Sequence, residues 1–369
     1  MNPSHVTAYW VGVNFFFQSL ASFTIIKYTI SMQEEFEKAE VVAINKQGTN
    51  NLDGVNVKFQ DLTLKIISGS DAGKTVKLTN GGQTFITDAQ LVATGEVLIL
   101  DKTQNGYLIL DKYRLDAVPY LLIGFAVLFL AVAGKRGIGS ILGIIISLAV
   151  ILGFIIPQII GGANPLLVSI AGSVVILLVT TYLAHGVSKQ TTIALVSTLI
   201  ALVIAAALSL LSVNFTHLAG IGDDAAVSLL TASSTSNINL QGLLLSGIII
   251  GTLGALNDIT TTQSATIFEL HETNKKLGFD ELVSRGMRVG REHITSLVNT
   301  LVLAYAGSSL AIFIYFILNP GKQPLWVVLN NEVIIDEVVR TFAGTIGLIL
   351  AIPIVTLLAG WWVTRSKAN

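Results

Sequence analysis

The sequence predicts a polytopic α-helical membrane protein with about eight transmembrane helices and a small extracellular β-rich domain inserted between helices one and two. The first observation behind this prediction is composition: 52% of the 369 residues are hydrophobic, 12% are charged, and the mean hydropathy is +0.72. Soluble domains carry about 25% charged residues, so much of the usual water-facing surface is missing. The second is the recurrence of apolar segments near the ~20 residues that cross a bilayer. The third is one stretch of short β-branched runs near the N-terminus.

The apolar segments set the order of the chain. No basic stretch precedes the first of them, and it is long enough to span, so we interpret it as a retained anchor. The resulting domains are an N-terminal transmembrane helix over 1–30, the β-rich domain over 31–116 and a seven-helix transmembrane domain over 117–369. The eight segments run over approximately 7–27, 117–134, 138–160, 166–185, 191–213, 242–268, 290–318 and 341–364.

The distribution of Lys and Arg between the short loops predicts the orientation of the spans. Loops on one side carry ten of these residues, whereas loops on the other side carry only Lys322 and Arg340. Because basic loops remain in the cytoplasm, we expect both termini to be cytoplasmic and residues 31–116 to be extracellular. The ten basic residues are Lys135, Arg136, Lys189, Lys275, Lys276, Arg285, Arg288, Arg291, Arg365 and Lys367.

Residues 31–116 alternate turn residues with short β-branched runs such as VVAI at 41–44. Runs of this length, separated by Asn-Gly turns, are typical of a small antiparallel barrel or sandwich. The string GSDAGKT at 69–75 resembles a phosphate-binding loop, but it is one residue short and is followed by strand-like VKL rather than a helix. We therefore favour a hairpin turn there. The chain has no cysteine, so disulfides do not stabilise this domain.

One ionisable residue lies deep within a predicted span. Asp258 follows Gly242 by sixteen residues, or ~24 Å along a helix at 1.5 Å per residue. An ionisable side chain inside a membrane is costly and by default marks a functional site. The polar residues around Asp258 form a stripe on the helix, and such a stripe is unsuited to face lipid. The polar neighbours of Asp258 in the sequence are Asn257, Thr261, Thr262 and Gln263.

The next apolar segment supplies a candidate partner for this carboxylate. Arg291 is followed at four-residue steps by Thr295 and Asn299, which form a second polar stripe. An antiparallel hairpin with Asp258 and Arg291 at one depth turns midway between them, inside the basic string TNKKLG at 273–278. This coincidence favours an Asp258–Arg291 pair. The alternative is a structural, hydrogen-bonded Asp258 and an Arg291 that extends to the lipid headgroups.

Gly247, Gly251 and Gly254 are spaced near-regularly, and we expect them to allow close helix contact and sliding. The acidic and histidine residues at the ends of these helices form no recognisable metal motif, so we expect solvated helix ends, no metal and no cofactor. We expect no enzymatic activity, because an intramembrane aspartyl protease needs two neighbouring carboxylates. The net charge of −1 gives no sign of nucleic-acid binding. The expected partners are the lipid bilayer, an unknown substrate, and a homo-oligomer or a partner membrane subunit.

Three strings carry a resemblance to a known family: GALNDITTTQSATIFEL at 254–270, GREHI at 290–294 and NTLVLAYAG at 299–307. They resemble the YibE/F family of bacterial multipass membrane proteins, over about residues 90–365. That family is described as predicted membrane proteins or permeases. The resemblance therefore implies an architecture and a bacterial cell membrane rather than a defined activity.

A second resemblance is confined to residues 243–317. The hairpin resembles the proton-relay hairpin of the SecD/SecF branch of the RND superfamily, in which an Asn-Asp pair is followed by an Arg-led helix. Asn257, Asp258 and Arg291 match those positions. Outside the hairpin the match fails, because four spans rather than two separate it from the exposed domain, which is also smaller than RND porter domains.

The leading hypothesis is a permease, either a secondary transporter or an export-assisting protein, driven by the proton gradient. In it Asp258 accepts the proton and Arg291 is the counter-charge. The polar relay would comprise Asn257, Thr261, Thr262, Gln263, Thr295 and Asn299. The alternative is a non-transporting scaffold or sensor that acts through its extracellular domain.

Overall fold

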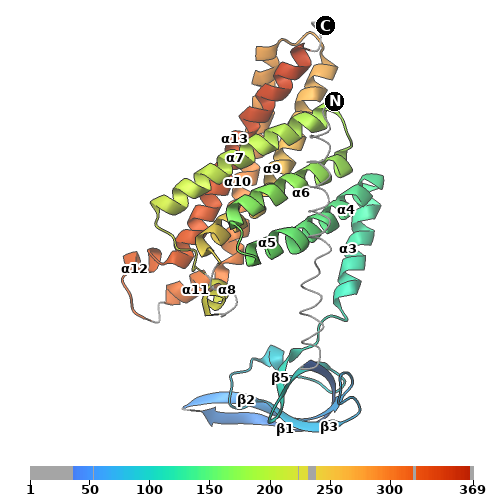
Figure 1. Cartoon of the computed structure of the whole chain (residues 1–369), viewed down its shortest axis with the longest axis vertical. Coiled ribbons are helices and arrows are strands. Elements are labelled where there is room, and N and C mark those ends of the chain that lie inside the picture. The colour runs from blue at the N-terminus through green and yellow to red at the C-terminus, as the bar shows by residue number, and fades with distance from the viewer. Residues whose placement is uncertain (1–35, 53, 223, 232–237, 319–320, 366–369) are drawn as a thin grey trace. The chain divides into compact units, whose positions relative to one another are not determined.

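The computed structural model describes residues 36–365 apart from 53, 223, 232–237 and 319–320, and the chain divides into two compact units between residues 131 and 132 (Figure 1). The predicted first span, 7–27, lies outside the described residues.

The first unit contains a five-stranded antiparallel sheet in the order β3-β2-β1-β4-β5. The sheet curls, and its two edge strands, β3 and β5, approach each other (Figure 1). The prediction of a small antiparallel β-rich unit is confirmed. The strands are β1 (Phe36–Leu52), β2 (Val55–Ile66), β3 (Thr75–Gly81), β4 (Val97–Thr103) and β5 (Gly106–Lys112).

Alternation along the strands builds the core of this sheet. In β2 every second residue, Leu62, Leu64 and Ile66, is fully buried. Side chains two residues apart lie on the same face of a strand, so these three point inward together. They pack against Val41 of β1 and Leu100 of β4.

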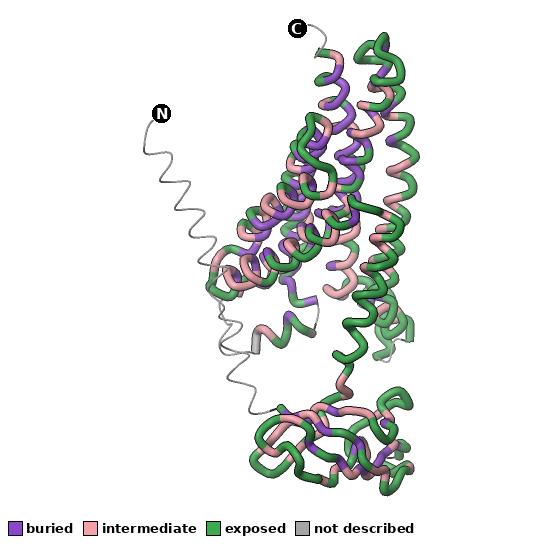
Figure 2. Tube along the Cα trace, turned by 90° about the vertical axis from the view of Figure 1, so that its right-hand side faces the viewer, coloured by how far each residue is buried: buried purple, intermediate pink, exposed green. Residues whose placement is uncertain are grey.

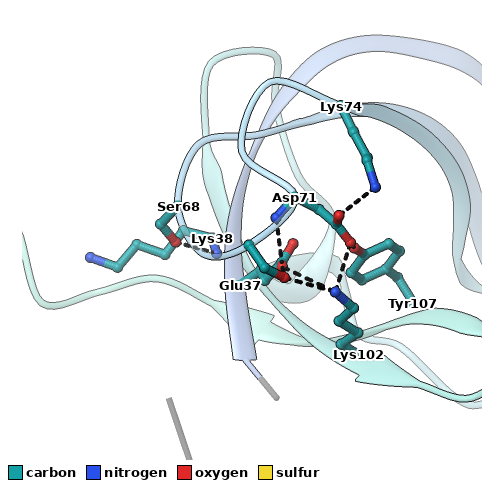
Figure 3. A network of polar contacts seen from close by, with 8 residues as sticks. Glu37, Lys38, Ser68, Asp71, Lys74, Lys102 and Tyr107 are labelled. Carbon is teal, nitrogen blue, oxygen red and sulfur yellow. Dashed lines mark hydrogen bonds and ion pairs between the residues drawn. The ribbon is translucent and has the colours of Figure 1, made fainter. Parts of the chain in front are cut away.

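The string at 69–75 is a turn between β2 and β3, as predicted. Gly69 and Gly73 both have positive φ, at +86° and +96°, a conformation that glycine adopts without strain. Figure 3 shows Asp71 at the centre of the turn, where it bonds Lys74, Tyr107 and Lys102, the last at 2.8 Å. Buried Glu37 accepts the backbone N–H of Asp71 at 3.2 Å. The polar side chains of this loop therefore bond one another.

The second unit is a bundle of long apolar helices, preceded by the 16-residue helix α3 (Val118–Ala133), which extends to its start. The bundle is that of a helical membrane protein. Its elements are α4 (Lys135–Val150), the π-helical turn η2 (Ile151–Ile155), α5 (Ile156–Ile160), α6 (Pro165–His185), α7 (Lys189–Phe215), α8 (Asp224–Thr231), α9 (Leu240–Thr273), α10 (Phe279–Ser308), α11 (Leu310–Leu318), α12 (Leu325–Leu329) and α13 (Glu332–Arg365).

Five of these helices are long and apolar enough to cross a membrane, and a bent pair makes a sixth if it is one span. The five run over 137–160 and over α6, α7, α9 and α13. Among the described residues the expected count of eight spans is thus not confirmed. The segment predicted over 117–134 forms α3, which at ~24 Å is shorter than the ~30 Å hydrocarbon layer.

The span predicted over 290–318 is broken in two. The chain bends by 61° between α10 and α11. The break follows the string GSS at 307–309, and Ser309 leaves the helical conformation, with φ −97° and ψ 11°. Glycine and serine pairs are common sites of sharp helix kinks, which accounts for the difference from the predicted continuous span.

Helices α7, α9 and α13 pack against one another at the centre of the bundle, with α6 and α10 beside α9. Buried positions gather along the inner sides of the helices, whereas the outer sides are exposed (Figure 2). Small residues permit this packing. A Cβ on Gly344 of α13 would lie 2.4 Å from Thr252 of α9, and one on Gly347 would lie 2.9 Å from Ala205 of α7.

A π-helical turn, η2, interrupts the helix between α4 and α5. Pro157 follows it within the first two residues of α5. A proline inside a helix lacks the N–H and clashes with the carbonyl four residues before it, and a wider π turn relieves this conflict. The turn places Ile151 at the candidate site described below.

Candidate functional site

Most polar side chains in the middle of α9 hold the bundle together. Gln263 is fully buried and donates to the Gly286 carbonyl of α10 at 2.9 Å and to Thr356 Oγ1 of α13 at 2.8 Å. Thr260 Oγ1 lies 2.5 Å from Thr198 Oγ1 of α7. Gln263, a predicted relay residue, therefore joins three helices.

Asn257 is also anchored to a neighbouring helix. Its side-chain oxygen accepts a hydrogen bond from Thr181 Oγ1 of α6 at 2.8 Å. Thr261 is buried and donates to the Asn257 carbonyl at 2.7 Å, whereas Thr262 is exposed and donates to the Asp258 carbonyl at 2.8 Å. The two threonine hydroxyls thus donate within their own helix, and their oxygen atoms retain the capacity to accept.

Asp258 differs from these neighbours because its carboxylate is exposed and lines a cleft between α4, α6 and α9. The cleft has a volume of about 500 Å³. Apolar residues of all three helices form much of its wall. The polar residues that line it are Ser140, Ser147, Thr180, His185, Asn257 and Asp258.

One end of this cleft lies toward the α9–α10 connection. Ser264 Oγ of α9 donates to the Gln190 carbonyl at the start of α7 at 2.9 Å. The α6–α7 connection therefore lies beyond Asp258 on the side of the α9–α10 turn. His185, the last residue of α6, and Ser140, near the start of α4, line this end of the cleft.

Helices α9 and α10 form the predicted antiparallel hairpin, but its register is offset. A Cβ on Gly286 would lie 2.1 Å from Ile267, and one on Gly290 would lie 3.2 Å from Gln263. Residues at the same height in two antiparallel helices have numbers with a constant sum, and this sum is 553 for both pairs. Asp258 of α9 is therefore level with Thr295 of α10. Arg291 lies one helical turn, ~6 Å, nearer to the connection.

The predicted Asp258–Arg291 pair is not among the ion pairs of the described residues. Arg291, Thr295 and Asn299 lie on an exposed face of α10, and Thr295 Oγ1 donates to the Arg291 carbonyl at 3.0 Å. The one-turn offset between the two charged residues accounts for the separation. The carboxylate and the guanidinium remain on neighbouring helices.

The glycines Gly247, Gly251 and Gly254 lie on the same exposed face of α9 as Asp258. Within the described part of the chain, a Cβ on Gly247 or Gly254 would meet no atom within 4 Å, and one on Gly251 would meet only Tyr305 Oη, at 3.5 Å. Among the described residues, no neighbouring helix packs tightly on this face, which is open over several turns, whereas close helix contact was expected.

The sequence did not single out several polar residues that the structure places in the bundle. Thr180, Thr181 and His185 belong to α6, a predominantly apolar helix, and nothing in the sequence distinguishes them from its other polar residues. Arg340 was expected in a loop, but α13 begins at Glu332, so Arg340 and Glu337 both lie within this helix. Their place in the helix is not apparent from hydropathy, because charged residues at the end of a long helix lower the local hydropathy to that of a loop.

Comparison with known families decides the assignment of the chain. A family model described as YibE/F-like protein matches residues 121–365. The chain belongs to the YibE/F-like family. No curated protein and no solved structure matches it. The matched range includes the whole of the α9–α10 hairpin and the cleft around Asp258.

The chemistry available at this YibE/F-like site is that of a carboxylate among hydroxyls, an amide and an imidazole. Among the described residues, no group of three His, Asp or Glu side chains is arranged to hold a metal ion. A carboxylate can accept and release one proton, and hydroxyl groups both donate and accept hydrogen bonds. The site thus offers one carboxylate, an amide, hydroxyl groups and an imidazole to a bound molecule.

Proposed function

We propose that this protein is a membrane permease, either a secondary transporter or an export-assisting protein, that couples a proton gradient to its work through Asp258. It would lie in the bacterial cell membrane with the α9–α10 connection in the cytoplasm and the β-rich unit outside, as the loop charges predict. Arg291 acts as the counter-charge. The relay of water and protons comprises Asn257, Thr261, Thr262, Thr295 and Asn299.

The observation that carries this proposal is the contrast between Asp258 and its polar neighbours. Asn257, Thr260 and Gln263 bond adjacent helices, which explains their presence in an apolar helix. Among the described residues, Asp258 has no hydrogen bond to a neighbouring helix, and it lines the cleft. A charged side chain at this depth is costly, so it is retained for a purpose other than packing.

Protonation of Asp258 would change the charge on the wall of the cleft by one unit. A change of this kind biases a helix bundle between two arrangements when the carboxylate interacts differently with each of them. The offset register places the Arg291 guanidinium one turn away. An arrangement of the helices that brings Arg291 closer to Asp258 would stabilise the ionised carboxylate. In the present arrangement the two groups are one turn apart, so this stabilisation is missing.

The test uses purified protein in liposomes that contain a pH-sensitive dye, with a proton gradient imposed across the membrane. Proton flux, alone or with added substrates, should be present in the wild type and lost in Asp258→Asn. Glu269→Gln is the matched control, because Glu269 is an exposed carboxylate three turns further along α9. Flux that persists unchanged in Asp258→Asn contradicts the proposal.

A groove in the β-rich unit favours a second candidate, a scaffold or sensor that binds an envelope ligand. The groove has a volume of about 960 Å³ and lies between the edge strands β3 and β5. The strand order, with these edges brought together, is that of an OB-like barrel, a fold that binds ligands on its surface. Phe85 and Leu108, 65% and 60% exposed, provide apolar contacts at its rim.

If the protein is a scaffold or sensor, substitutions in the groove should abolish its function and substitution of Asp258 should not. In a strain that lacks the protein, complementation by Phe85→Asp or Leu108→Asp should fail, whereas Asp258→Asn should complement. If the Asp258 variant fails and the two groove variants complement, the scaffold is excluded and transport is favoured.

A further inference from the structure

A second cluster of titratable side chains lies near the end of the bundle away from the α9–α10 connection. Tyr305 of α10 approaches Gly251 of α9, and the charges of Arg340 and Glu337 of α13 both act on its hydroxyl. Glu337 and Arg340 are three residues apart in α13, so they lie on one face of that helix. Two helices, α10 and α13, therefore contribute the cluster, and its tyrosine lies beside α9.

The cluster contains buried polar atoms without a hydrogen-bond partner. Oε2 of Glu337 and Nε of Arg340 are both inaccessible, and neither has a partner among the described residues. Leaving a buried acceptor and a buried donor unpaired costs about 1–3 kcal/mol each, and more when the groups are charged. A small molecule that donates to one and accepts from the other removes this cost, and water is such a molecule.

Tyr305 of the cluster and Asp258 both adjoin the open face of α9. Gly251, beside Tyr305, precedes Asp258 by two turns, which is ~10.5 Å along the helix. Gly254 lies between them, and a Cβ there would meet no atom of the described residues within 4 Å. At hydrogen-bond separations of about 2.8 Å, three water molecules bridge such a distance.

We propose that Tyr305, Glu337 and Arg340 form a water-binding station that connects Asp258 with the end of the bundle opposite the α9–α10 connection. The glycines of α9 leave the space for the water between the station and Asp258. This inference rests on the proposed function and deepens it, because it supplies the second half of a path for water and protons through the bundle by way of Asp258. The first half is the part of the cleft between Asp258 and His185, and Gly254 lines the same cleft on the other side of Asp258.

The absence of cysteine from the chain makes water access directly measurable. A thiol reacts with methanethiosulfonate reagents as its thiolate, which forms in water and not in lipid. Gly251→Cys and Gly254→Cys, in sealed vesicles of each orientation, should react with a membrane-impermeant reagent applied from the side opposite the α9–α10 connection. The reference variant is Val203→Cys, because Val203 is an apolar residue of α7 that is 62% exposed.

The expected result is labelling of Gly254→Cys at least about tenfold faster than labelling of Val203→Cys, because only the former thiol ionises in water. Labelling no faster than that of Val203→Cys would overturn the proposal, whether or not the protein transports protons. Labelling that occurs only from the side of the α9–α10 connection would overturn it too.

A second measurement separates this inference from the proposed function. Gly254→Leu fills the space between Asp258 and Tyr305, and Tyr305→Phe removes the hydroxyl while keeping the ring. Both should abolish proton flux, whereas Val203→Leu, on an exposed position of α7 away from this face, should leave it intact. Flux that is lost in Asp258→Asn but retained in Gly254→Leu and Tyr305→Phe would refute the station and leave the role of Asp258 standing.

Discussion

Two glycines of the bundle are expected to respond in opposite ways to the same substitution. A Cβ on Gly347 would lie 2.9 Å from the Cβ of Ala205, whereas a Cβ on Gly254 would meet nothing within 4 Å. Carbon atoms in contact lie at about 3.5–4.0 Å, so Gly347→Ala must move α13 away from α7 by nearly 1 Å. Ala205 has no flexible side-chain end that could yield instead.

The magnitudes follow from these distances. Overpacking of this kind costs about 1–3 kcal/mol in the free energy of unfolding. Gly254→Ala has no such cost, and the higher helix propensity of alanine stabilises it by up to about 1 kcal/mol. Unfolding in mixed detergent micelles with increasing denaturing detergent, followed by circular dichroism, measures both changes.

A third variant tests the reason for the difference. Ala205→Gly removes the atom that Gly347→Ala would meet, so the double variant should recover most of the lost stability. Equal destabilisation by Gly254→Ala and Gly347→Ala would refute the reasoning, because it would mean that the face of α9 that bears Gly254 is packed.

Three further outcomes are expected. Hydrogen bonds from Lys102, Lys74 and Tyr107 hold the pKa of Asp71 well below its usual range. Its carboxylate therefore stabilises the fold fully above the unfolded pKa of about 3.9, and this stabilisation decreases as the pH falls from there toward the lowered native pKa. Amide hydrogen exchange in the β2–β3 turn should be faster in Asp71→Asn than in the wild type at pH 7, and the difference should narrow steadily as the pH falls below about 4. Leu64→Ala should cost about 2–5 kcal/mol, measured by denaturant titration, because Leu64 is fully buried. A double-mutant cycle of Gln263→Leu and Thr356→Val should give a coupling energy of about 0.6 kcal/mol, the average for hydrogen bonds between membrane helices, and zero coupling would refute the bond.

The membrane class and the antiparallel sheet were predictable because each depends on a pattern of many residues. Strand alternation in β2 is visible in the sequence as Leu62, Leu64 and Ile66, and these residues form the core. The hairpin was predictable because its connection is a short basic string between two apolar segments. Its register was not, because the register depends on contacts between particular side chains, such as Gln263 with the carbonyl of Gly286.

The role of the glycines was the least predictable feature of the site. Spacing places Gly247, Gly251 and Gly254 on one face of a helix, and a small-residue face suits close packing and an open path equally well. Only the positions of the neighbouring helices distinguish the two. The same limit applies to the polar residues of α9. Gln263 and Asp258 are both polar residues of one apolar segment, but among the described residues Gln263 bonds neighbouring helices and Asp258 does not.

The most direct test of the central claim compares Asp258→Glu with Asp258→Asn in proteoliposomes under an imposed proton gradient. Glutamate keeps the group that takes up the proton and moves it by one methylene, whereas asparagine keeps the size and removes the group. We expect wild-type flux to be reduced in Asp258→Glu and absent in Asp258→Asn. Equal flux in Asp258→Asn and the wild type would contradict a proton-accepting role for Asp258.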